Sequence, residues 1–347
     1  MAKDEQIERL LDLIDRYRES GIDSQIDYSK FYLYSIITHS TAIEGSTVTE
    51  IENQLLFDQG LTSSGRTIAE QMMNLDLKAA YEASIAMARD KIQVNVEMLK
   101  NLASLVMKNT GSSYKTALGE FSSAGGDLRL LNVTAGAGGK SYLSYSKVPA
   151  ALEEFCQWLN GERTKEMTVP QRYNLSFDAH YYLVTIHPWA DGNGRMARLL
   201  MNHIQFEAGL IPTKVFKEDK GEYIKALAQT RESGNLDIFR GFMLEETIKS
   251  ISSDLAYYRQ STEDPGLLGD AGFLPSSYSK PKKEKKEKSR DKILRLLHLY
   301  PKMTTKTIAE KTGISVKAVE KHLANLKRDG LLRREGSDRS GWWVVNP

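Results

Sequence analysis

The chain has 347 residues, of which 41% are hydrophobic and 27% charged, as in an ordinary globular protein of about two domains. The formal net charge of +2 conceals an asymmetry: residues 281–347 have a net charge of +10, and the rest of the chain has −8. A single cysteine, Cys156, excludes an intramolecular disulfide and fits a reducing compartment. The charged N-terminus lacks the apolar core of a signal peptide, and no stretch approaches the ~20 apolar residues of a membrane span. We therefore expect a cytoplasmic protein.

Helical periodicity covers most of the first 260 residues. Apolar residues recur at helical spacing in the stretches 5–18, 28–39, 51–57, 66–88, 96–108, 149–160, 171–186, 194–208, 221–231 and 235–259. Thr47, with Glu50 three residues later, fits an N-cap with its capping-box glutamate. These stretches predict an all-α body.

Residues 118–147 break this pattern. The stretch is rich in Gly, Ser and Thr and contains a short alternating piece at residues 140–145. These features predict a loop with a small β-hairpin. The simplest interpretation of a hairpin in a helical body is a surface decoration.

The C-terminal part begins with a linker, residues 261–288, that ends in a run of lysine and glutamate. Such a run is more typical of a solvated spacer than of a nucleic-acid arm. Residues 289–347 predict a helix, then a helix-turn-helix in which Ser315 caps the third helix, and then strands at 331–335 and 341–345. This order of elements indicates a winged helix-turn-helix domain.

The positive charge of this domain favours an anionic partner. Lys317, Lys321 and Asn325 fall on the exposed side of the expected recognition helix, and Arg339 falls in the wing. DNA contact is one interpretation of this pattern. A winged helix that docks a protein is the other, and the sequence does not separate the two.

The strongest signal for chemistry is the stretch HPWADGNGRMAR, residues 187–198. Pro188 disfavours helix at His187, which places the histidine at the mouth of a loop. Gly192 and Gly194 allow a tight turn that approaches a ligand closely. The free N–H groups and the positive dipole end of the helix that follows form a phosphate site.

Arg195 and Arg198 are three residues apart, so they project from one helical face and can clamp two phosphates. Asp191 lies beside this anion site, and a carboxylate next to phosphates needs a cation, usually Mg²⁺. His187 can take a proton from an attacking hydroxyl group while the cradle stabilises charge on the transferring phosphorus. A loop with a buried histidine and exposed arginines is the plain alternative. This alternative is disfavoured because one short stretch supplies the base, the metal ligand and the phosphate-binding groups together.

This stretch resembles the signature of the Fic family, HxFx(D/E)GNGRxxR. The resemblance implies an all-helical Fic domain that transfers AMP from ATP to Ser, Thr or Tyr hydroxyl groups of a target protein. It implies that His187 is the base and Asp191 the Mg²⁺ ligand. It also assigns the ATP and phosphate site to Gly192, Asn193, Gly194, Arg195 and Arg198. Trp189 departs from the family's usual phenylalanine, which affects local packing more than chemistry.

Two further assignments follow from the resemblance. The 132–147 hairpin looks like the family's flap, which pairs with an extended segment of the target, and Tyr142 and Leu143 would clamp a target side chain. Asn202, four residues after Arg198 on the same helical face, is expected to line the nucleotide pocket. The expected organisation is an N-terminal helical region (1–90), a Fic catalytic domain (91–260), a linker (261–288) and a winged helix (289–347).

Residues 40–45, STAIEG, resemble the family's inhibitory motif, (S/T)xxxE(G/N). The resemblance implies that Glu44 pairs with Arg198, which removes the arginine meant for the γ-phosphate and misplaces the phosphates of bound ATP. Thr41 with Glu44 also fits a helix capping box, and this is the alternative. The same glutamate could instead position a water that removes AMP from a modified target, and the sequence does not separate these roles.

Three other functions compete with this one. A Fic-like site can use another diphosphate donor, because its phosphate machinery does not read the base. The chain could instead be a nucleotide-sensing DNA-binding transcriptional regulator, which the intact His187 disfavours. A metal hydrolase built on His180 and His187 lacks the HExxH spacing, and His180 fits a helix-packing residue. The expected partners are ATP, Mg²⁺, an unknown target protein and a second copy in a homodimer, with DNA as a further candidate and no membrane.

Overall fold

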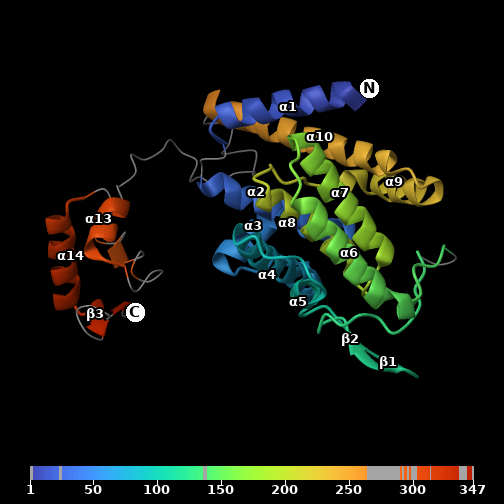
Figure 1. Ribbon diagram of the computed structural model, residues 1–347, viewed down its shortest axis with the longest axis horizontal. Helices are drawn as coiled ribbons and strands as arrows, with labels where there is room; N and C mark the ends of the chain where they lie inside the picture. The colour runs from blue at the N-terminus through green and yellow to red at the C-terminus, as the bar shows by residue number, and fades with distance from the viewer. Residues whose placement is uncertain are drawn as a thin grey trace. The chain divides into compact units, whose positions relative to one another are not determined.

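The computed structural model describes residues 3–22, 26–135, 139–263, 303–312, 314–335 and 342–345, together with residues 290, 293, 294 and 297. The chain divides into two compact units, residues 1–273 and 274–347 (Figure 1). None of the described helices is long and apolar enough to cross a membrane.

The first unit is built of helices, with one short regular strand pair in its described part. Its helices are α1 (Lys3–Glu19), α2 (Ile26–Ile43), α3 (Glu50–Gln59), α4 (Ile68–Arg89), α5 (Val96–Val106), α6 (Val148–Arg163), α7 (Val169–Ile186), α8 (Asn193–Glu207), α9 (Lys220–Ser233) and α10 (Leu236–Glu263). Its strands are β1 (Ser113–Thr116) and β2 (Gly119–Ser122), and its 3-10 turns are η2 (Tyr145–Lys147) and η3 (Lys217–Asp219). The expected all-α class is confirmed.

Helices α7 and α8 form the centre of this unit, and α4 packs along α8. Met196, Leu199 and Leu200 of α8 are fully buried in the main apolar cluster. The same helix also buries the side chains of Arg195 and Arg198. Burying an arginine costs several kcal/mol unless it is well paired, so charges at the centre of a fold point to a function rather than to stability.

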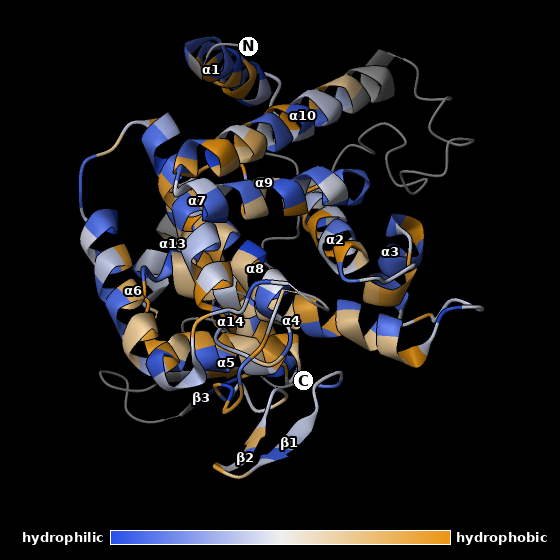
Figure 2. Cartoon of the chain, turned by 90° about the vertical axis from the view of Figure 1, so that its right-hand side faces the viewer, coloured by the Kyte–Doolittle hydropathy of each residue, from blue (hydrophilic) through white to orange (hydrophobic). Residues whose placement is uncertain are grey.

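A second apolar cluster joins α1, α7, α9 and α10. Leu10, Phe177 and Phe239 are fully buried there, and α1 packs against α10. Figure 2 shows hydrophilic and hydrophobic residues interspersed along α1, as expected of a helix with one face on the core and one in water. This packing holds α9 in place, and α9 supplies Tyr223 and Arg231 to the functional site.

The start of α3 differs from the sequence prediction. Thr49 and Glu52, rather than Thr47 and Glu50, form the capping box: the Glu52 N–H donates to Thr49 Oγ1 at 3.3 Å, and the Thr49 N–H donates to Glu52 Oε2 at 2.7 Å. Thr47 instead donates to Glu70 of α4, through its N–H at 2.7 Å and its hydroxyl group at 2.6 Å. Thr47 and Thr49 could each cap the helix by sequence. The contact of Thr47 with Glu70 of α4 leaves Thr49 as the N-cap.

The predicted hairpin lies only partly where the sequence placed it. The regular strands β1 and β2 pair antiparallel over residues 113–122, with Tyr114 stacked on Phe121 at 4.8 Å. In the predicted flap, residues 132–147, a single β-bridge joins Thr134 to Ser141, and residues 136–138 lie outside the described residues. Glycines weaken strand pairing, which explains why this segment forms less sheet than predicted.

The second unit contains α13 (Thr305–Thr312), α14 (Val316–Arg328), β3 (Leu332–Glu335) and β4 (Trp342–Val345). These elements share a separate apolar core formed by Ile293, Leu297, Ile308, Ala309, Val319, Leu323, Leu326, Leu332 and Trp343. Ser315 caps α14 by accepting from the Ala318 N–H at 3.3 Å. Strands β3 and β4 pair antiparallel. The helix-turn-helix and the two-stranded wing match the predicted fold.

Candidate active site

His187 ends α7 in the left-handed backbone conformation, with a φ of 53°. This conformation is strained for a residue with a side chain, and it persists only where the surroundings hold it. The following proline also disfavours helical geometry at this position. The chain therefore turns sharply out of α7 at His187.

The imidazole of His187 is held neutral. Burial is the main cause that lowers its pKa to about 4, and the charges of Arg129 and Arg231 act in the same direction. Its Nδ1 lies 3.3 Å from the carbonyl oxygen of Val184. A carbonyl oxygen only accepts, so Nδ1 carries the proton and Nε2 keeps its lone pair. A general base requires this form of histidine.

Arg129 connects the flap to the loop after α7. Its Nε donates to the His187 carbonyl oxygen at 2.8 Å, its Nη1 donates to the Leu131 carbonyl oxygen at 2.7 Å, and its Nη2 donates to the Leu143 carbonyl oxygen. Its backbone N–H donates to the Pro188 carbonyl oxygen at 3.0 Å. The side chain is 1% exposed. One buried guanidinium thus fixes both ends of the flap relative to His187.

The flap lies over His187. The Tyr142 ring stacks on the imidazole, with 3.8 Å between the ring centroids and 18° between the planes. The guanidinium of Arg231 lies 4.9 Å from the Tyr142 ring, and its Nη2 donates to the Ser141 carbonyl oxygen. The flap is therefore held by α9 on one side and by Arg129 on the other. Leu143 contributes its carbonyl oxygen to the contact with Arg129.

The loop from Pro188 to Gly194 is braced from within. Trp189 is 1% exposed, and its Nε1 donates to the Gly126 carbonyl oxygen at 3.1 Å. Asn193 closes the loop in both directions: its Nδ2 donates to the Trp189 carbonyl oxygen at 2.9 Å, and its Oδ1 accepts from the Trp189 N–H at 3.1 Å. Asn193 therefore shapes the loop that presents the start of α8.

A side chain on either glycine of the loop would displace a neighbouring side chain. Gly192 has a φ of 81°, and a Cβ atom there would lie 2.7 Å from Met107 Sδ. A Cβ atom on Gly194 would lie 2.5 Å from Glu44 Oε1 and 3.2 Å from Arg198 Nη1. The Glu44 carboxylate thus lies against the first turn of α8, where the helix dipole and free N–H groups favour a negative charge.

Arg198 is the centre of the ion-pair network. Its Nη2 donates to Glu44 Oε1 at 2.6 Å and to the Ser40 carbonyl oxygen at 2.9 Å, and its Nε donates to Ser40 Oγ at 2.8 Å. Burial opposes the charge on Glu44, but the guanidiniums of Arg198 and Arg195 lower the pKa of its carboxyl group below the ordinary value. Both partners are therefore charged near neutral pH.

The alternative interpretation of Glu44 as part of a capping box is wrong. Thr41 lies inside α2, and Glu44 follows the last residue of that helix, so the pair does not start a helix. The Thr41 hydroxyl group instead donates to Asn74 on α4 at 2.7 Å.

Arg195 points toward the end of α5 and not toward α2. Its Nη1 lies 3.4 Å from the Val106 carbonyl oxygen and its Nη2 lies 3.1 Å from Met107 Sδ. Its side chain is 2% exposed, and its Nε has no hydrogen-bond partner among the described residues. A buried donor without a partner is costly, so Arg195 is suited to donate to a bound anionic ligand.

Asp191 is the one exposed carboxylate of the loop. Its side chain is 58% exposed, its Oδ1 accepts from the Gly192 N–H at 2.6 Å, and the same atom lies 3.7 Å from Arg195 Nη2. The described residues contain no group of three or more His, Cys, Asp or Glu that could hold a metal ion. A Mg²⁺ ion that takes one protein carboxylate, with its other ligands from phosphates and water, fits this arrangement.

His180 and Asn202 are supporting residues in this geometry. His180 is fully buried, and its Nε2 lies 2.9 Å from Tyr223 Oη, whose ring faces Arg198 at 5.9 Å. Asn202 is also fully buried. It accepts from Tyr81 Oη at 2.7 Å and donates to Gln205 Oε1 at 3.0 Å and to the Thr213 carbonyl oxygen at 2.9 Å. The Asn202 amide is thus occupied by protein groups beneath the site.

Sequence reasoning missed four residues that organise the site: Arg129, Arg231, Tyr223 and Asn74. For Arg129 one signal existed, because it is the only basic residue between Lys115 and Lys140. The other three belong to ordinary amphipathic helices, and no local pattern distinguishes them. Their roles depend on which helices meet.

The exposed face of α14 carries the predicted DNA-contacting residues. Lys317 and Lys321 are exposed, and Asn325 is partly exposed. Lys327 and Arg334 both lie over the Trp343 ring, at 4.9 and 5.1 Å from its centroid. Arg339 lies outside the described residues.

Two stretches of the chain match known protein families. Residues 93–205 match the Fic/DOC family, and residues 287–333 match a winged helix-turn-helix DNA-binding family. The chain therefore contains a Fic/DOC domain, which includes the whole loop from His187 to Arg198, and a C-terminal winged helix.

Curated relatives carry a more specific name. The chain is 25% identical over 247 residues to the protein adenylyltransferase fic-1 of Caenorhabditis elegans, covering 71% of this chain and 45% of the relative. It is 26% identical over 268 residues to the protein adenylyltransferase Fic of Drosophila mojavensis, covering 72% of this chain and 50% of the relative. The chain thus spans about half the length of the curated relatives it matches.

Solved structures share the fold. A Fic-domain-containing signaling protein from Bacteroides thetaiotaomicron superposes with a TM-score of 0.61 at 22% identity, covering 72% of this chain and 97% of that one. A Fic family protein from Desulfovibrio desulfuricans superposes with a TM-score of 0.59 at 17% identity, covering 99% of this chain and 95% of that one.

Proposed function

We propose that the chain is a protein adenylyltransferase that moves AMP from ATP onto a Ser, Thr or Tyr hydroxyl group of a target protein, and that Glu44 inhibits it. The names of the curated relatives support the reaction class. The observation that carries the proposal is the 2.6 Å contact between Arg198 Nη2 and Glu44 Oε1, made at the start of the helix that follows the His187 loop.

The chemistry follows from the neutral state of His187. Its Nε2 takes the proton of the target hydroxyl group as the hydroxyl oxygen forms a bond to the α-phosphorus of ATP. The bond between that phosphorus and the oxygen bridging to the β-phosphorus breaks, and pyrophosphate leaves. The N–H groups at the start of α8, with Arg195 and Arg198, stabilise the negative charge on the phosphates. The assigned ATP and phosphate site comprises Gly192, Asn193, Gly194, Arg195, Arg198 and Asn202, of which Asn202 is fully buried with its amide bonded to protein groups.

Mg²⁺ would be held by Asp191 and by the phosphates, and it would neutralise phosphate charge during transfer. Asp191 is suited to this role because its side chain is mostly exposed and its position is fixed by the Gly192 N–H.

The flap is proposed to receive the target. Its edge around Tyr142 and Leu143 would pair with an extended target segment by β-augmentation. The stacking of Tyr142 on His187 would place the target hydroxyl group close to the base.

Glu44 has two possible roles in the same position. As an inhibitor it would occupy the start of α8 and bind the arginine needed for the γ-phosphate. As a participant in de-AMPylation it would hold a water against the AMP-modified target. An assay that starts from AMP-modified protein distinguishes them, because only the second role requires Glu44 for AMP release.

A second function is proposed for the winged helix, which is DNA binding through Lys317, Lys321, Asn325 and Arg339. The match to a DNA-binding winged helix family and the exposed lysines of α14 favour it. Replacing Lys317 and Lys321 with glutamate should weaken DNA binding and reduce its salt dependence. Equal binding by the variant would point to a protein-docking domain. A homodimer is a further prediction, to be tested by light scattering.

The test of the reaction uses the position of the label. The Glu44→Gly protein should transfer label to protein from ATP labelled on the α-phosphate and not from ATP labelled on the γ-phosphate. The Glu44→Gly/His187→Ala protein should transfer neither. Transfer of the γ label, or no transfer of either label with ATP still bound, would contradict the proposal and favour another donor or a nucleotide-sensing regulator.

A further inference from the structure

We infer that Asn74 positions Glu44 by holding both ends of the turn that carries it. This inference rests on the proposed inhibitory function of Glu44. Asn74 lies on α4, outside the loop from His187 to Arg198, and contacts neither Glu44 nor Arg198 through any of its hydrogen bonds among the described residues.

The Asn74 amide bridges the turn from inside. Its Oδ1 accepts from Thr41 Oγ1 at 2.7 Å, and its Nδ2 donates to Ser46 Oγ at 3.1 Å. Thr41 and Ser46 flank Glu44 on either side. Asn74, Thr41 and Ser46 are all buried, with exposures of 0%, 0% and 6%. The two ends of the turn are therefore fastened to one side chain that water does not reach.

The backbone of the turn depends on the same two residues. The Glu44 N–H and the Ser46 N–H both donate to the Thr41 carbonyl oxygen, at 3.0 and 3.1 Å. Gly45 has a φ of 107° and nothing within 4 Å of where a Cβ atom would lie, so the chain itself does little to restrict this position. The side-chain bonds to Asn74 thus add a second restraint to these backbone bonds.

Glu44 benefits from such a restraint because its side chain is only partly buried and has one hydrogen-bonding partner in the described part of the chain. Its side chain is 32% exposed, and the carboxylate has one hydrogen-bonding residue among those described, which is Arg198. A glutamate loses rotamer entropy when it is held in one position. Its competition with a phosphate group for Arg198 therefore depends on how well the turn presents it.

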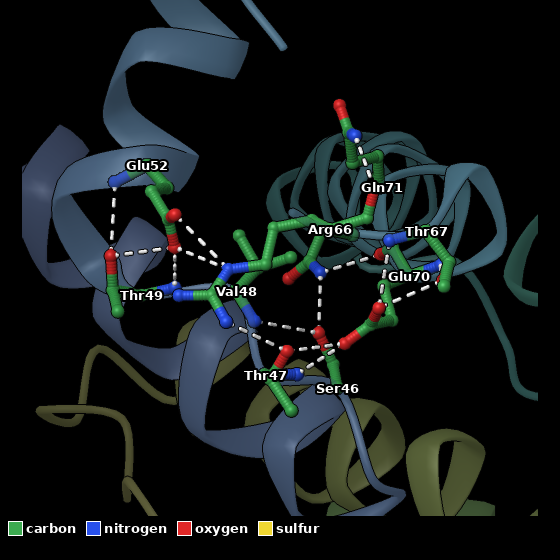
Figure 3. Close-up of polar contacts among 10 residues, drawn as sticks. Ser46, Thr47, Val48, Thr49, Glu52, Arg66, Thr67, Glu70 and Gln71 are labelled. Carbon is green, nitrogen blue, oxygen red and sulfur yellow. Dashed lines mark hydrogen bonds and ion pairs between the residues drawn. The ribbon is translucent and has the colours of Figure 1, made fainter. Parts of the chain in front are cut away.

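A second set of contacts holds the outer side of the same turn (Figure 3). The Glu70 carboxylate caps its own helix at Thr67 and accepts from both the N–H and the hydroxyl group of Thr47. Arg66 donates to Thr47 Oγ1 at 3.0 Å and to Glu52. The Glu70 carbonyl oxygen also accepts from Asn74 Nδ2 at 2.8 Å. Residues near the start of α4 therefore contact the turn on both sides: Asn74 on the buried side and Glu70 on the exposed side.

Removing the Asn74 bridge should weaken inhibition without touching the catalytic groups. In Asn74→Leu the side chain keeps its approximate volume but loses both bonds to the turn. Each such bond contributes modestly, so AMP transfer should rise on the order of tenfold above wild type and stay below the Glu44→Gly level. Because a buried polar-to-apolar change can unfold a protein, Thr41→Val/Ser46→Ala provides a second test that cuts the same bridge at its other ends.

The matched control is Thr38→Val. Thr38 lies on α2 one turn before Thr41 and is also buried. It accepts from the Asn53 amide that also donates to Asn74 Oδ1, but its side chain makes no bond to the turn, so it tests the network behind Asn74 without cutting the bridge. The same substitution at Thr38 should leave transfer at the wild-type level. The Asn74→Leu change made in the Glu44→Gly protein should add nothing, because Asn74 acts only through Glu44.

The experiment measures initial rates of label transfer from α-labelled ATP and, in the same proteins, hydrogen exchange of the amides of residues 44–46. Increased transfer and faster exchange in Asn74→Leu and in Thr41→Val/Ser46→Ala, but not in Thr38→Val, support the inference. Wild-type transfer in both bridge variants while Glu44→Gly is active overturns it, as does a loss of transfer in both backgrounds. If Glu44→Gly itself is inactive, the proposed function fails. In that case the hydrogen exchange of residues 44–46 still tests whether Asn74 holds the turn. Unchanged exchange in the bridge variants overturns the inference.

Discussion

Arg198 and Glu44 lie 154 positions apart in the chain, and their side chains meet at 2.6 Å, where the arginine is buried and the glutamate is partly exposed. The contact joins the end of α2 to the start of α8. It combines a buried arginine, which needs a negative partner, with a helix N-terminus, which favours one. A nucleotide phosphate would satisfy both requirements equally well, so the contact and phosphate binding exclude each other at this position.

Arg129→Ala should uncouple the flap from His187. The substitution leaves the carbonyl oxygens of His187, Leu131 and Leu143 without their donor. Small displacements of reacting groups can cost about 100-fold in rate, and we expect a loss of that order in the Glu44→Gly background. Initial rates of label transfer measure it. Arg129→Lys should not rescue the rate, because an ammonium group cannot reach three carbonyl oxygens in the planar geometry of guanidinium. Activity within a few-fold of the parent in both variants would contradict this role.

The rate should depend weakly on pH across the neutral range. The pKa of His187 is lowered from its ordinary value to about 4, mainly by burial. The base therefore stays neutral from about pH 8 to about pH 6, a range over which an ordinary histidine of pKa ~6.5 changes from mostly neutral to mostly protonated. The rate of the Glu44→Gly protein should be flat over that range and fall only as the pH approaches about 4.

The same shift has a consequence for stability. The unfolded chain binds a proton at His187 below about pH 6.5, whereas the folded chain does so only near pH 4, so this group stabilises the fold at neutral pH and loses that contribution as the pH falls between the two values. Tyr142→Ala should return the pKa of His187 toward its ordinary value, since the ring that covers the imidazole is removed. An NMR titration measures the pKa of His187 in the parent protein and in Tyr142→Ala. A pKa of about 6.5 in the parent would contradict the role of burial.

Much of this architecture could be predicted from sequence because it is local. The helices follow from apolar spacing, and the turn after His187 follows from Pro188 and the glycines of the loop. The interior partners are different. The sequence predicts that Thr47 caps a helix, whereas in the structure its N–H donates to Glu70 of α4. Nothing in the local sequence distinguishes Asn74, which donates to Ser46, from the other residues of its amphipathic helix. Their roles depend on contacts between distant segments, which no local pattern encodes.

Trp189→Phe should cost stability while leaving the chemistry in place. Phenylalanine removes the hydrogen bond from Trp189 Nε1 to the Gly126 carbonyl oxygen, and it leaves that oxygen unpaired in a buried position. We expect the free energy of unfolding to fall by about 1–3 kcal/mol. Urea denaturation measures the change. The rate of label transfer at a temperature where both proteins are folded should stay within a few-fold of the parent, and a larger loss would assign Trp189 a part in positioning the loop.

Gly192→Ala should destabilise the loop for two reasons. Its φ of 81° is strained for alanine by about 1–2 kcal/mol, and its new Cβ atom would lie 2.7 Å from Met107 Sδ. The matched control is Gly161→Ala on α6, where nothing lies within 4 Å of the new atom and alanine favours helix by about 0.5–1 kcal/mol. The urea midpoint should fall in Gly192→Ala and rise in Gly161→Ala. Equal shifts in the two variants would show that the loop relaxes freely around the new side chain.

The central claim is that the Glu44 carboxylate inhibits by holding Arg198. Its most direct test compares initial rates of AMP transfer from α-labelled ATP by wild type, Glu44→Gly and Glu44→Gly/Arg198→Ala. We expect low transfer in wild type, an increase of at least about tenfold in Glu44→Gly, and a loss of that increase when Arg198 is also removed, since a phosphate partner contributes at least ~1.4 kcal/mol. Equal rates in wild type and Glu44→Gly, or an increase that survives without Arg198, would contradict it.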